Sequence, residues 1–243
     1  MDPVAFELFG IEVMWYGILI SSGIIIGAIL AFREARRINF DDETLIDLLL
    51  YAIPLSIVGA RIYYVAFSWD YYSENLKEIF HIRGGGLAIH GAIAAAVIVA
   101  VIFCKRRKVN FWKVVDICAP SIILGQAIGR WGNYINQEAH GGPTDLPWGI
   151  IVDGVKVHPT FLYESVWNFA VFFYLIWYRK TKQKVTGEPF LLYLILYSVG
   201  RFFIEGLRTD SLMLGPIRVA QLVSMALIGI SIVIFSYRRK KDK

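Results

Sequence analysis

The sequence predicts an all-α polytopic membrane protein with about seven transmembrane helices, the N-terminus outside and the C-terminus in the cytoplasm. Hydrophobic residues make up 56 % of the 243 residues and charged residues only 19 %. The mean hydropathy is +0.53. Apolar runs of about twenty residues recur along the chain, and as helices they can cross a hydrocarbon core of ~30 Å. Basic residues gather in alternate loops, which indicates a fixed orientation in the membrane.

Seven apolar runs are predicted as spanning helices, because none shows the two-residue alternation of a membrane strand. In chain order they cover about Ile11–Phe32, Leu45–Phe67, Leu87–Cys104, Phe111–Ile128, Pro159–Trp177, Pro189–Leu207 and Ile217–Phe235. The first run is expected to remain as a helix rather than to be cleaved as a signal peptide, because acidic residues and no lysine or arginine precede it.

The basic residues set the predicted orientation. They form four clusters, which are Arg33, Arg36 and Arg37; Lys105, Arg106, Arg107 and Lys108; Arg179, Lys180, Lys182 and Lys184; and Arg238, Arg239, Lys240, Lys241 and Lys243. Basic residues favour the cytoplasmic side, so with seven spans the N-terminus lies outside. Each cluster adjoins a span, so topology explains the net charge of +5 better than nucleic-acid binding does.

One membrane domain, residues 1–243, is predicted, with a small extracytoplasmic cap at about 131–158. Inside the cap, Ile150–Val157 places two β-rich triplets around Asp153-Gly154, the pattern of a hairpin with a type I′ turn. A second outer segment, Ser68–Gly86, is amphipathic and aromatic. It is expected either to lie along the membrane interface or to form an aromatic belt at its edge.

A polar run, Gly129–Gly142, follows the fourth predicted span and holds an arginine, two asparagines, a glutamate and a histidine among four glycines. Polar groups at membrane depth are costly and usually mark a functional site. Other spans place polar residues at a similar outer depth, namely Tyr16, Arg61, His90, Glu164, Arg201, Glu205 and Arg208. Their gathering on one side favours a functional site over ion pairs that only hold helices together.

The sixth predicted span suggests what this site binds. Tyr197, Arg201, Glu205 and Arg208 recur at i, i+4, i+8 and i+11, so they share one helical face. Arg201 and Glu205 can pair within the helix, which leaves Arg130 and Arg208 as candidate positive charges. The planar donor fork of arginine suits phosphate oxygens.

Two further features fit a phosphate site. The glycines at 84–86 can expose backbone N–H groups as an anion nest. His90 can accept a proton near neutral pH, although a histidine at the start of a span can equally be a packed, hydrogen-bonded residue.

Several common catalytic arrangements are missing from the sequence. It has no Ser-His-Asp pattern, no CxxC, no Walker loop and no metal-ligand cluster of suitable spacing, so neither a metal nor a cofactor is predicted. If the protein is an enzyme, the nucleophile comes from a substrate. The protein would then provide a grip on phosphate, a base and a dry, lipid-accessible cavity.

The pattern Gly129-Arg130-x-Gly132-Asn133-Tyr134-x-Asn136-x-Glu138-x-x-Gly141 resembles the signature of the bacterial phosphatidylglycerol–prolipoprotein diacylglyceryl transferases. The similarity continues in order over essentially the whole chain. It includes Trp15-Tyr16-Gly17, Gly59-Ala60-Arg61, Gly85 to Gly91, Thr144 to Gly149, His158-Pro159-Thr160, Leu162-Tyr163-Glu164 and the sixth-span residues from Tyr197 to Arg208. Ala92 and Thr209-Asp210 depart mildly from the family pattern. These departures put the loop geometry in question rather than the reaction.

The resemblance implies a multi-pass enzyme of the bacterial cytoplasmic (inner) membrane whose active site faces the outer leaflet. Such an enzyme transfers the diacylglyceryl group of phosphatidylglycerol to the lipobox cysteine thiol in the signal peptide of a prolipoprotein. The reaction forms a thioether and releases glycerol phosphate, as the first step of lipoprotein maturation. A leaving phosphate would explain the arginines, and a substrate thiol would explain why no nucleophile is found here.

The residues that match the family divide into two predicted groups. The catalytic group is His90, Arg130, Glu138 and Arg201. The substrate-binding group is Tyr16, Arg61, Asn133, Asn136, Gly141, Tyr197, Glu205 and Arg208. Arg130 and Arg201 are expected to bind the phosphate or headgroup, with Arg208 in support. Either His90 or Glu138 takes the proton, and Glu138 could instead only hold Arg130.

Two other classes of function remain open at this stage. A lipid or anion transporter would continue its polar groups to the cytoplasmic face, where the sequence offers only Asp47 and Asp116, each near a basic loop. A structural membrane scaffold would lose only folding when Arg130 or His90 is replaced.

Overall fold

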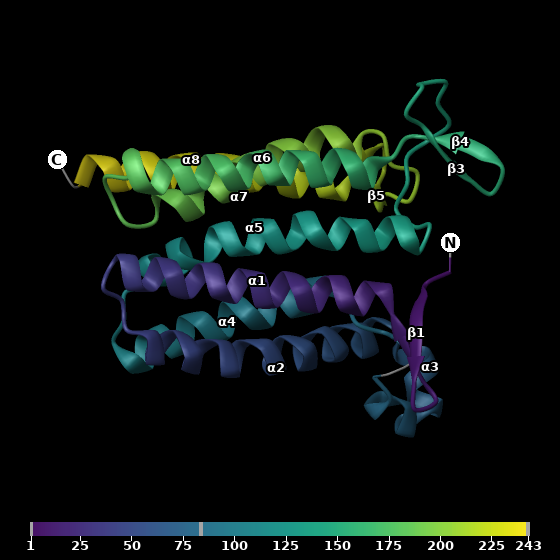
Figure 1. The fold of residues 1–243 in the computed structure, drawn as a ribbon, viewed down its shortest axis with the longest axis horizontal. Helices are drawn as coiled ribbons and strands as arrows, with labels where there is room; N and C mark the ends of the chain where they lie inside the picture. Colours follow the sequence, from purple (N-terminus) through teal and green to yellow (C-terminus); the bar gives the residue numbers. More distant parts are fainter. Residues whose placement is uncertain (1, 83–84, 242–243) are drawn as a thin grey trace. The chain divides into compact units, whose positions relative to one another are not determined.

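The computed structural model describes residues 2–82 and 85–241 and is mostly helical (Figure 1). The long helices are α1 (Trp15–Arg37), α2 (Asp42–Phe67), α4 (Ile89–Arg107), α5 (Phe111–Ile135), α6 (Thr160–Thr181), α7 (Glu188–Glu205) and α8 (Val219–Lys241). Two short helices, α3 (Trp69–Glu74) and the 3₁₀ helix η1 (Leu76–Phe80), follow α2. Arg83 and Gly84 lie outside the described residues. Gly84 is one of the three glycines of the predicted anion nest.

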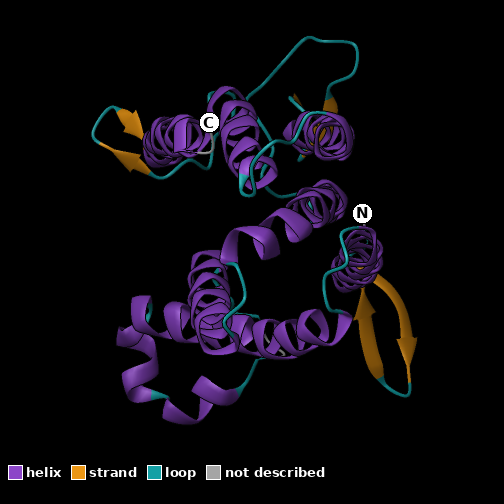
Figure 2. Cartoon of the chain, turned by 90° about the vertical axis from the view of Figure 1, so that its left-hand side faces the viewer, coloured by secondary structure: helices purple, strands orange, loops and turns teal. Residues whose placement is uncertain are grey.

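Three two-stranded antiparallel hairpins accompany the helices (orange in Figure 2). They are β1 (Val4–Leu8) with β2 (Ile11–Met14), β3 (Ile150–Val152) with β4 (Val155–Val157), and β5 (Met213–Leu214) with β6 (Ile217–Arg218). The second hairpin follows the pattern expected from sequence: Val152 pairs with Val155, and both turn residues have positive φ, 49° at Asp153 and 79° at Gly154.

Five helices, α1, α2, α4, α5 and α8, are long and apolar enough to cross a membrane. The apolar stretch of α8 has a mean hydropathy of 2.2, yet only 11 % of it is buried. Outward-facing apolar side chains of this kind are stable only in lipid or in a larger assembly. The structure therefore has the character of a helical membrane protein, as the sequence predicts.

The remaining two predicted spans correspond to α6 and α7, which have 22 and 18 residues. Neither is among the five helices that are long and apolar enough to cross a membrane. In α7 the reason is that Glu188, Arg201 and Glu205 all lie within its 18 residues. The count of seven spans therefore stays a prediction.

Several predicted boundaries are wrong, for local reasons. The first helix begins at Trp15 rather than Ile11, because Ile11–Met14 forms β2. The last helix begins at Val219 rather than Ile217, because Ile217 and Arg218 form β6. α5 continues to Ile135, seven residues beyond the predicted end at Ile128, so Arg130 and Asn133 lie on the helix rather than in a loop after it.

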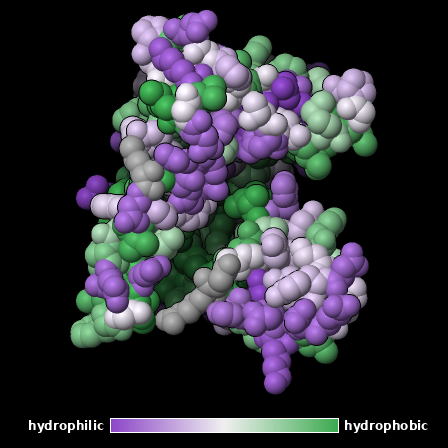
Figure 3. Space-filling view, turned by 90° about the vertical axis from the view of Figure 1, so that its right-hand side faces the viewer, coloured by the Kyte–Doolittle hydropathy of each residue, from purple (hydrophilic) through white to green (hydrophobic). Residues whose placement is uncertain are grey.

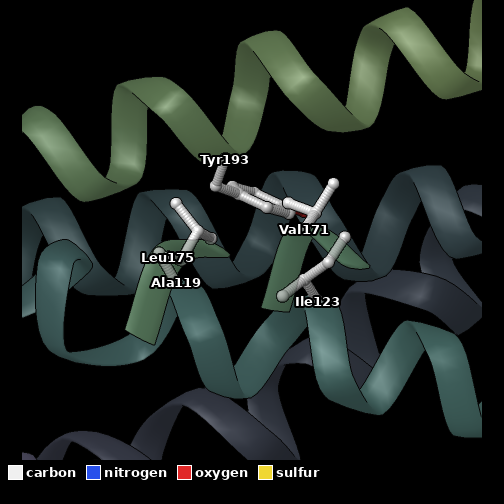
Figure 4. Close-up of a cluster of buried hydrophobic side chains, with 5 residues drawn as sticks. All are labelled: Ala119, Ile123, Val171, Leu175 and Tyr193. Atoms are coloured by element: carbon white, nitrogen blue, oxygen red, sulfur yellow. The ribbon is translucent and has the colours of Figure 1, made fainter. Parts of the chain in front are cut away.

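The chain divides into two compact units, of which the first contains residues Met1–Glu34 and Val115–Lys243. Its core joins α5, α6 and α7 through Ala119, Ile123, Val171, Leu175 and Tyr193 (Figure 4). The Tyr193 hydroxyl in this core accepts a hydrogen bond from Gln126 Nε2 at 3.0 Å, so the buried phenol has a polar partner. This packing sets the positions of the ends of α5, α6 and α7.

Polar contacts lock the basic end of the first unit. Asp116 on α5 accepts hydrogen bonds from the backbone N–H groups of Gly187 and Phe190, at 2.5 and 3.0 Å, and so caps the start of α7. Glu188 accepts from Tyr178 and from Arg239, at 3.0 and 2.5 Å. Asp116 is thus a helix cap rather than a free polar group on a path through the membrane.

The second unit contains Ala35–Val114 and consists mainly of α2 and α4. These two helices approach closely where both carry small residues: a Cβ added to Gly91 would overlap the carbonyl oxygen of Gly59 and the Cβ of Tyr63. Small residues allow such close backbone approach between membrane helices. At the other end of the pair, Asp47 on α2 forms an ion pair with Arg107 on α4.

Replacing Gly91 by alanine is expected to lower the free energy of unfolding by roughly 1–3 kcal/mol, because the new methyl group has to push α2 and α4 apart. A thermal-unfolding measurement in detergent would detect the loss. Gly229→Ala in α8 is the matched control, since nothing lies within 4 Å of its added Cβ and alanine favours helix. Equal melting temperatures for the two variants would contradict the close packing.

Candidate functional site

The buried carboxylate of Glu164, on the first turns of α6, joins three arginines from different parts of the first unit. Its Oε2 lies 2.7 Å from Arg130 Nε, and its Oε1 lies 3.0 Å from Arg201 Nη1 and 3.4 Å from Arg208 Nη1. Glu164 is only 3 % exposed. A carboxylate has about four acceptor positions, so it can bind several guanidinium groups at once. Glu164 therefore fixes the relative positions of the three guanidinium groups.

A second carboxylate completes this arginine cluster, which we define as Arg130, Glu164, Arg201, Glu205 and Arg208. Glu205 Oε2 lies 2.6 Å from Arg201 Nη2, one helical turn away on α7, which confirms the predicted pair. Glu205 is 2 % exposed. Arg201 is thus held between two buried carboxylates, one from its own helix and one from α6.

Arg208 lies beyond the end of α7 and has an additional partner. Its Nε and Nη2 donate to the two carboxylate oxygens of Asp210, at 2.9 and 2.6 Å, a bidentate pair. The hydrogen bond from Arg208 is the main reason that the pKa of Asp210 lies below its usual range. Arg130 and Arg208, the two charges left unpaired in the sequence prediction, therefore both have carboxylate partners.

Asp210→Asn is expected to destabilise the protein at neutral pH by at most about 1 kcal/mol, because the Asp210 side chain is half exposed and solvent screens the pair. A carboxyl group whose pKa is lowered by folding stabilises the native state above its unfolded pKa of about 3.9. This stabilisation is lost as the pH falls through the lowered pKa. Unfolding curves of wild type and variant should therefore separate at pH 7 and converge in strong acid.

The polar run forms the last turns of α5, up to Ile135, and then a tight turn. Arg130 Nη1 donates to Asn133 Oδ1 at 3.2 Å, and Asn133 Nδ2 donates to Glu138 Oε1 at 2.9 Å. Gln137 and Ala139, on either side of Glu138, have φ of 55° and 58°, a left-handed conformation that is costly for residues other than glycine. The strained turn holds Glu138 at the protein surface, connected to Arg130 through Asn133 rather than paired with it.

The other predicted members of this run also have defined places. Asn136 Nδ2 donates to Glu138 Oε1 at 3.4 Å, so two amide groups orient this carboxylate. Gly141 is buried, and it bridges to Arg208 in antiparallel fashion while its N–H donates to His158 O at 2.9 Å. A Cβ on Gly141 would approach the Leu207 carbonyl oxygen to 3.0 Å. Glycine at 141 is needed because the loop passes this close to the chain before Arg208.

Tyr16 and Tyr197 contribute aromatic surface in the first unit. The Tyr16 ring lies against α5, where a Cβ on Gly132 would overlap it. Tyr197 on α7 stacks with Tyr193 at a centroid distance of 6.0 Å. Figure 3 looks along the helices from the end where α1 begins, and hydrophilic residues lie among hydrophobic ones there.

Arg61 and His90 belong to the second unit. Arg61 is 6 % exposed, and its guanidinium donates to backbone carbonyl groups between Glu78 and Gly86. His90 is exposed on the first turn of α4, and its ring centroid lies 6.1 Å from that of Tyr63. The predicted roles of His90 as base and of Arg61 as a substrate ligand stay predictions.

The three arginines of the cluster differ in how far their side chains are exposed. Arg130 and Arg201 keep side-chain exposures of 21 % and 19 %, whereas Arg208 is 10 % exposed and its fork is occupied by Asp210. Preorganised guanidinium donors of this kind stabilise charge that develops on a phosphate oxygen. Within residues 2–82 and 85–241, no three His, Cys, Asp or Glu side chains gather where they could hold a metal ion.

Glu164 is the member of this site whose role the sequence prediction missed. The sequence places it among the polar residues of the outer half, but it was not assigned to catalysis or to substrate binding. The available signal was that Glu164 is the single charged residue in the run from Phe161 to Tyr178. Partners in α5 and α7 are distant in sequence, so only the packing of the helices reveals that Glu164 binds both Arg130 and Arg201.

The fold and site define a helical membrane protein with a partly exposed cluster of arginines that buried carboxylates hold in place. A profile of the prolipoprotein diacylglyceryl transferase family matches residues 3–237. A phosphatidylglycerol–prolipoprotein diacylglyceryl transferase of Finegoldia magna is 56 % identical over 242 residues, covering 100 % of this chain and 97 % of that protein. A protein of the same name from Clostridioides difficile is 53 % identical, covering 100 % of this chain and 98 % of that protein. Another, from Bacillus cereus (strain Q1), is 54 % identical, covering 99 % of this chain and 93 % of that protein. The chain belongs to the prolipoprotein diacylglyceryl transferase family.

Proposed function

We infer that this chain transfers the diacylglyceryl group of phosphatidylglycerol to the cysteine thiol of a prolipoprotein, the first step of lipoprotein maturation. Family membership over essentially the whole chain supports this function. The single structural observation that carries it is the binding of Arg130, Arg201 and Arg208 to one buried carboxylate, Glu164. Three guanidinium groups held in one place suit the phosphate that leaves in this reaction.

The bond changes define what the site has to do. The cysteine sulfur of the lipobox attacks the glyceryl carbon that carries the phosphate, forming a C–S bond as the C–O bond to phosphate breaks. The thiol proton leaves with a base, and the electron pair of the broken bond stays on the phosphate oxygen. The products are the thioether-linked prolipoprotein and glycerol phosphate. Charge therefore develops on phosphate, where arginine donors stabilise the transition state.

Arg130 and Arg201 are the proposed phosphate ligands. Both remain partly exposed, and Glu164 holds each of them through a single guanidinium nitrogen. Arg208 supports them from a more enclosed position, because Asp210 occupies its Nε and Nη2. Asn133 orients Arg130 and also contacts Glu138, so it couples the phosphate ligand to a candidate base.

Two residues remain candidates for the base. Glu138 is exposed, and two amide donors orient its carboxylate. His90 is exposed at the start of α4, and the imidazole of a histidine is a common general base. A base near the thiol would raise the fraction of thiolate, which is the reactive form.

The proposed orientation follows from the distribution of charge in the first unit. Its arginine cluster lies where α5 ends and α6 begins, whereas Arg179, Lys180, Lys184 and the basic end of α8 lie at the opposite helix ends. Because basic residues favour the cytoplasmic side, the cluster faces the outer leaflet. The proposal includes seven spans, an outer N-terminus and a cap that contains β3 and β4, in the bacterial cytoplasmic membrane.

The function is tested with purified protein in phosphatidylglycerol nanodiscs and a peptide that carries a lipobox cysteine. The expected result is a peptide whose mass increases by one diacylglyceryl group, with release of glycerol phosphate. Phosphatidylethanolamine nanodiscs of the same acyl composition test the headgroup. Absence of the thioether with phosphatidylglycerol would overturn the proposed function. Flux of lipid or phosphate without chemistry would instead favour the transporter alternative.

A further inference from the structure

Arg61 in the second unit has an unusual set of partners for a buried arginine. Its Nε donates to Ile79 O at 2.9 Å, its Nη1 donates to Gly85 O and Gly86 O at 3.1 and 3.0 Å, and its Nη2 donates to Glu78 O and His81 O at 2.5 and 3.2 Å. A guanidinium group has five N–H donors, and these five carbonyl groups can use all of them. All five N–H donors of Arg61 can therefore be used within this turn.

The contacts of Arg61 determine how the turn before α4 is built. Gly85 and Gly86 have φ of 91° and 71°, values that glycine alone adopts readily. A Cβ on Gly86 would overlap both Arg61 Nη1 and the Tyr64 ring. The two glycines are therefore required for their carbonyl groups to reach the same guanidinium nitrogen.

Peptide geometry then determines where the N–H groups of this turn point. In a trans peptide the C=O and the following N–H point in opposite directions. The carbonyl groups of Gly85 and Gly86 both point at Arg61 Nη1, so the N–H groups of Gly86 and Leu87 both point away from it. Within residues 2–82 and 85–241, neither N–H has a hydrogen-bond acceptor. Successive N–H groups that point in one direction form an anion-binding nest.

We propose that the backbone N–H groups of Gly86 and Leu87 bind a phosphate oxygen, and that Arg61 is the positioning residue that orients them. The inference rests on the proposed function for the identity of the ligand, a glycerol phosphate group. That group is present in phosphatidylglycerol before transfer and in glycerol phosphate after it. The nest recognises the phosphate chemistry that both share.

Selective isotope labelling observes the proposed donor directly. With [1-¹³C]glycine and [¹⁵N]leucine, only a leucine that follows a glycine gives a carbonyl-filtered amide signal, and this chain has two such pairs, Gly86-Leu87 and Gly206-Leu207. Leu207 N–H already donates to Ile204 O at 3.0 Å, so its signal reports that the protein is folded. Substituting Leu87 by isoleucine removes one signal and assigns the pair.

Glycerol 1-phosphate added to wild-type protein in phosphatidylcholine nanodiscs is expected to move the Leu87 amide signal downfield in a saturable manner. Phosphatidylglycerol nanodiscs and inorganic phosphate are the two other arms. A shift with the lipid alone assigns the nest to the donor substrate, and a shift with glycerol 1-phosphate but not with inorganic phosphate assigns it to the product. A Leu87 signal that moves with none of the three overturns the proposal.

Arg61→Lys tests the positioning role. The ammonium group keeps the charge but has only three donors for the five carbonyl groups, so the apparent affinity for glycerol 1-phosphate in this titration is expected to fall at least tenfold. Arg107→Lys, in the same unit, is the matched control, because its partner is the carboxylate of Asp47. An Arg61→Lys protein that gives the Leu207 signal and binds with wild-type affinity would contradict the role of Arg61.

The titration and the transfer assay fail independently. Wild-type protein that forms the thioether but shows no Leu87 shift would overturn the nest while the proposed function stands. Wild-type protein that shows the shift but never forms the thioether would overturn the proposed function while leaving a phosphate-binding turn.

Discussion

Glu164→Gln is expected to lower the rate of diacylglyceryl transfer at least about 100-fold and to destabilise the fold. The substitution keeps the shape of the side chain but removes the negative charge that joins Arg130, Arg201 and Arg208. Removing one partner from a buried ion pair typically costs about 3–5 kcal/mol, because the remaining charge is left without compensation. Each 1.36 kcal/mol of lost transition-state stabilisation lowers the rate of transfer about tenfold. We expect part of the cost of the broken ion pairs to be lost from the transition state, which accounts for the predicted loss of activity.

The experiment combines the thioether assay with a thermal-unfolding curve for each variant. Glu7→Gln is the matched control: it makes the same chemical change on an exposed strand, β1, of the same unit. Glu164→Asp separates charge from reach, because it keeps the negative charge but shortens the side chain by one methylene group. Wild-type transfer in Glu164→Gln would show that the arginine cluster does not depend on this carboxylate. A folded but inactive variant would place the defect in the site.

Arg130→Lys is expected to lower the rate of transfer by about 10²–10³-fold, which is the usual cost of losing one preorganised donor to developing charge. Arg130 uses Nε for Glu164 and Nη1 for Asn133, so its planar fork holds two partners in place at once. A lysine ammonium group is a point charge on a flexible chain and cannot reproduce this geometry. Arg130→Ala removes the charge as well and is expected to be at least as severe.

Steady-state kinetics with varied phosphatidylglycerol distinguish how Arg130 acts. A phosphate ligand that binds mainly in the transition state lowers kcat, whereas a ligand that binds substrate and transition state equally raises KM alone. Arg33→Lys, an exposed arginine on α1 outside the site, is the control and should keep wild-type kinetics. Full activity of Arg130→Ala would contradict the proposed mechanism, whatever the result for Glu164.

Helix positions were well predicted because the signal is strong and local. Each predicted span overlaps one long helix, since runs of apolar residues of membrane length have few other stable structures. The ends were harder to place. The strands β2 and β6 occupy segments that were predicted as helix from hydropathy alone, because a short apolar strand and a helical turn have similar compositions.

The candidate site shows the same division between local and long-range information. Arg201 and Glu205 were paired correctly from their spacing, because i, i+4 neighbours on a helix always lie on one face. The role of Glu138 as a possible partner of Arg130 does not fit the geometry, in which Arg130 binds Glu164 and reaches Glu138 only through Asn133. Nearness in sequence favoured Glu138, and helix packing brings Glu164 closer.

The sequence by itself determined the class of this protein: a helical membrane protein whose motifs, from Tyr16 to Arg208, belong to the prolipoprotein diacylglyceryl transferases. That information is local, since hydropathy and motif spacing do not depend on how the helices meet. Only the tertiary structure decided the partners. Glu164 joins arginines from α5, from α7 and from beyond the end of α7, and Arg61 binds carbonyl groups 17 to 25 residues away. These contacts depend on the three-dimensional arrangement of whole helices and turns, which no single stretch of sequence specifies.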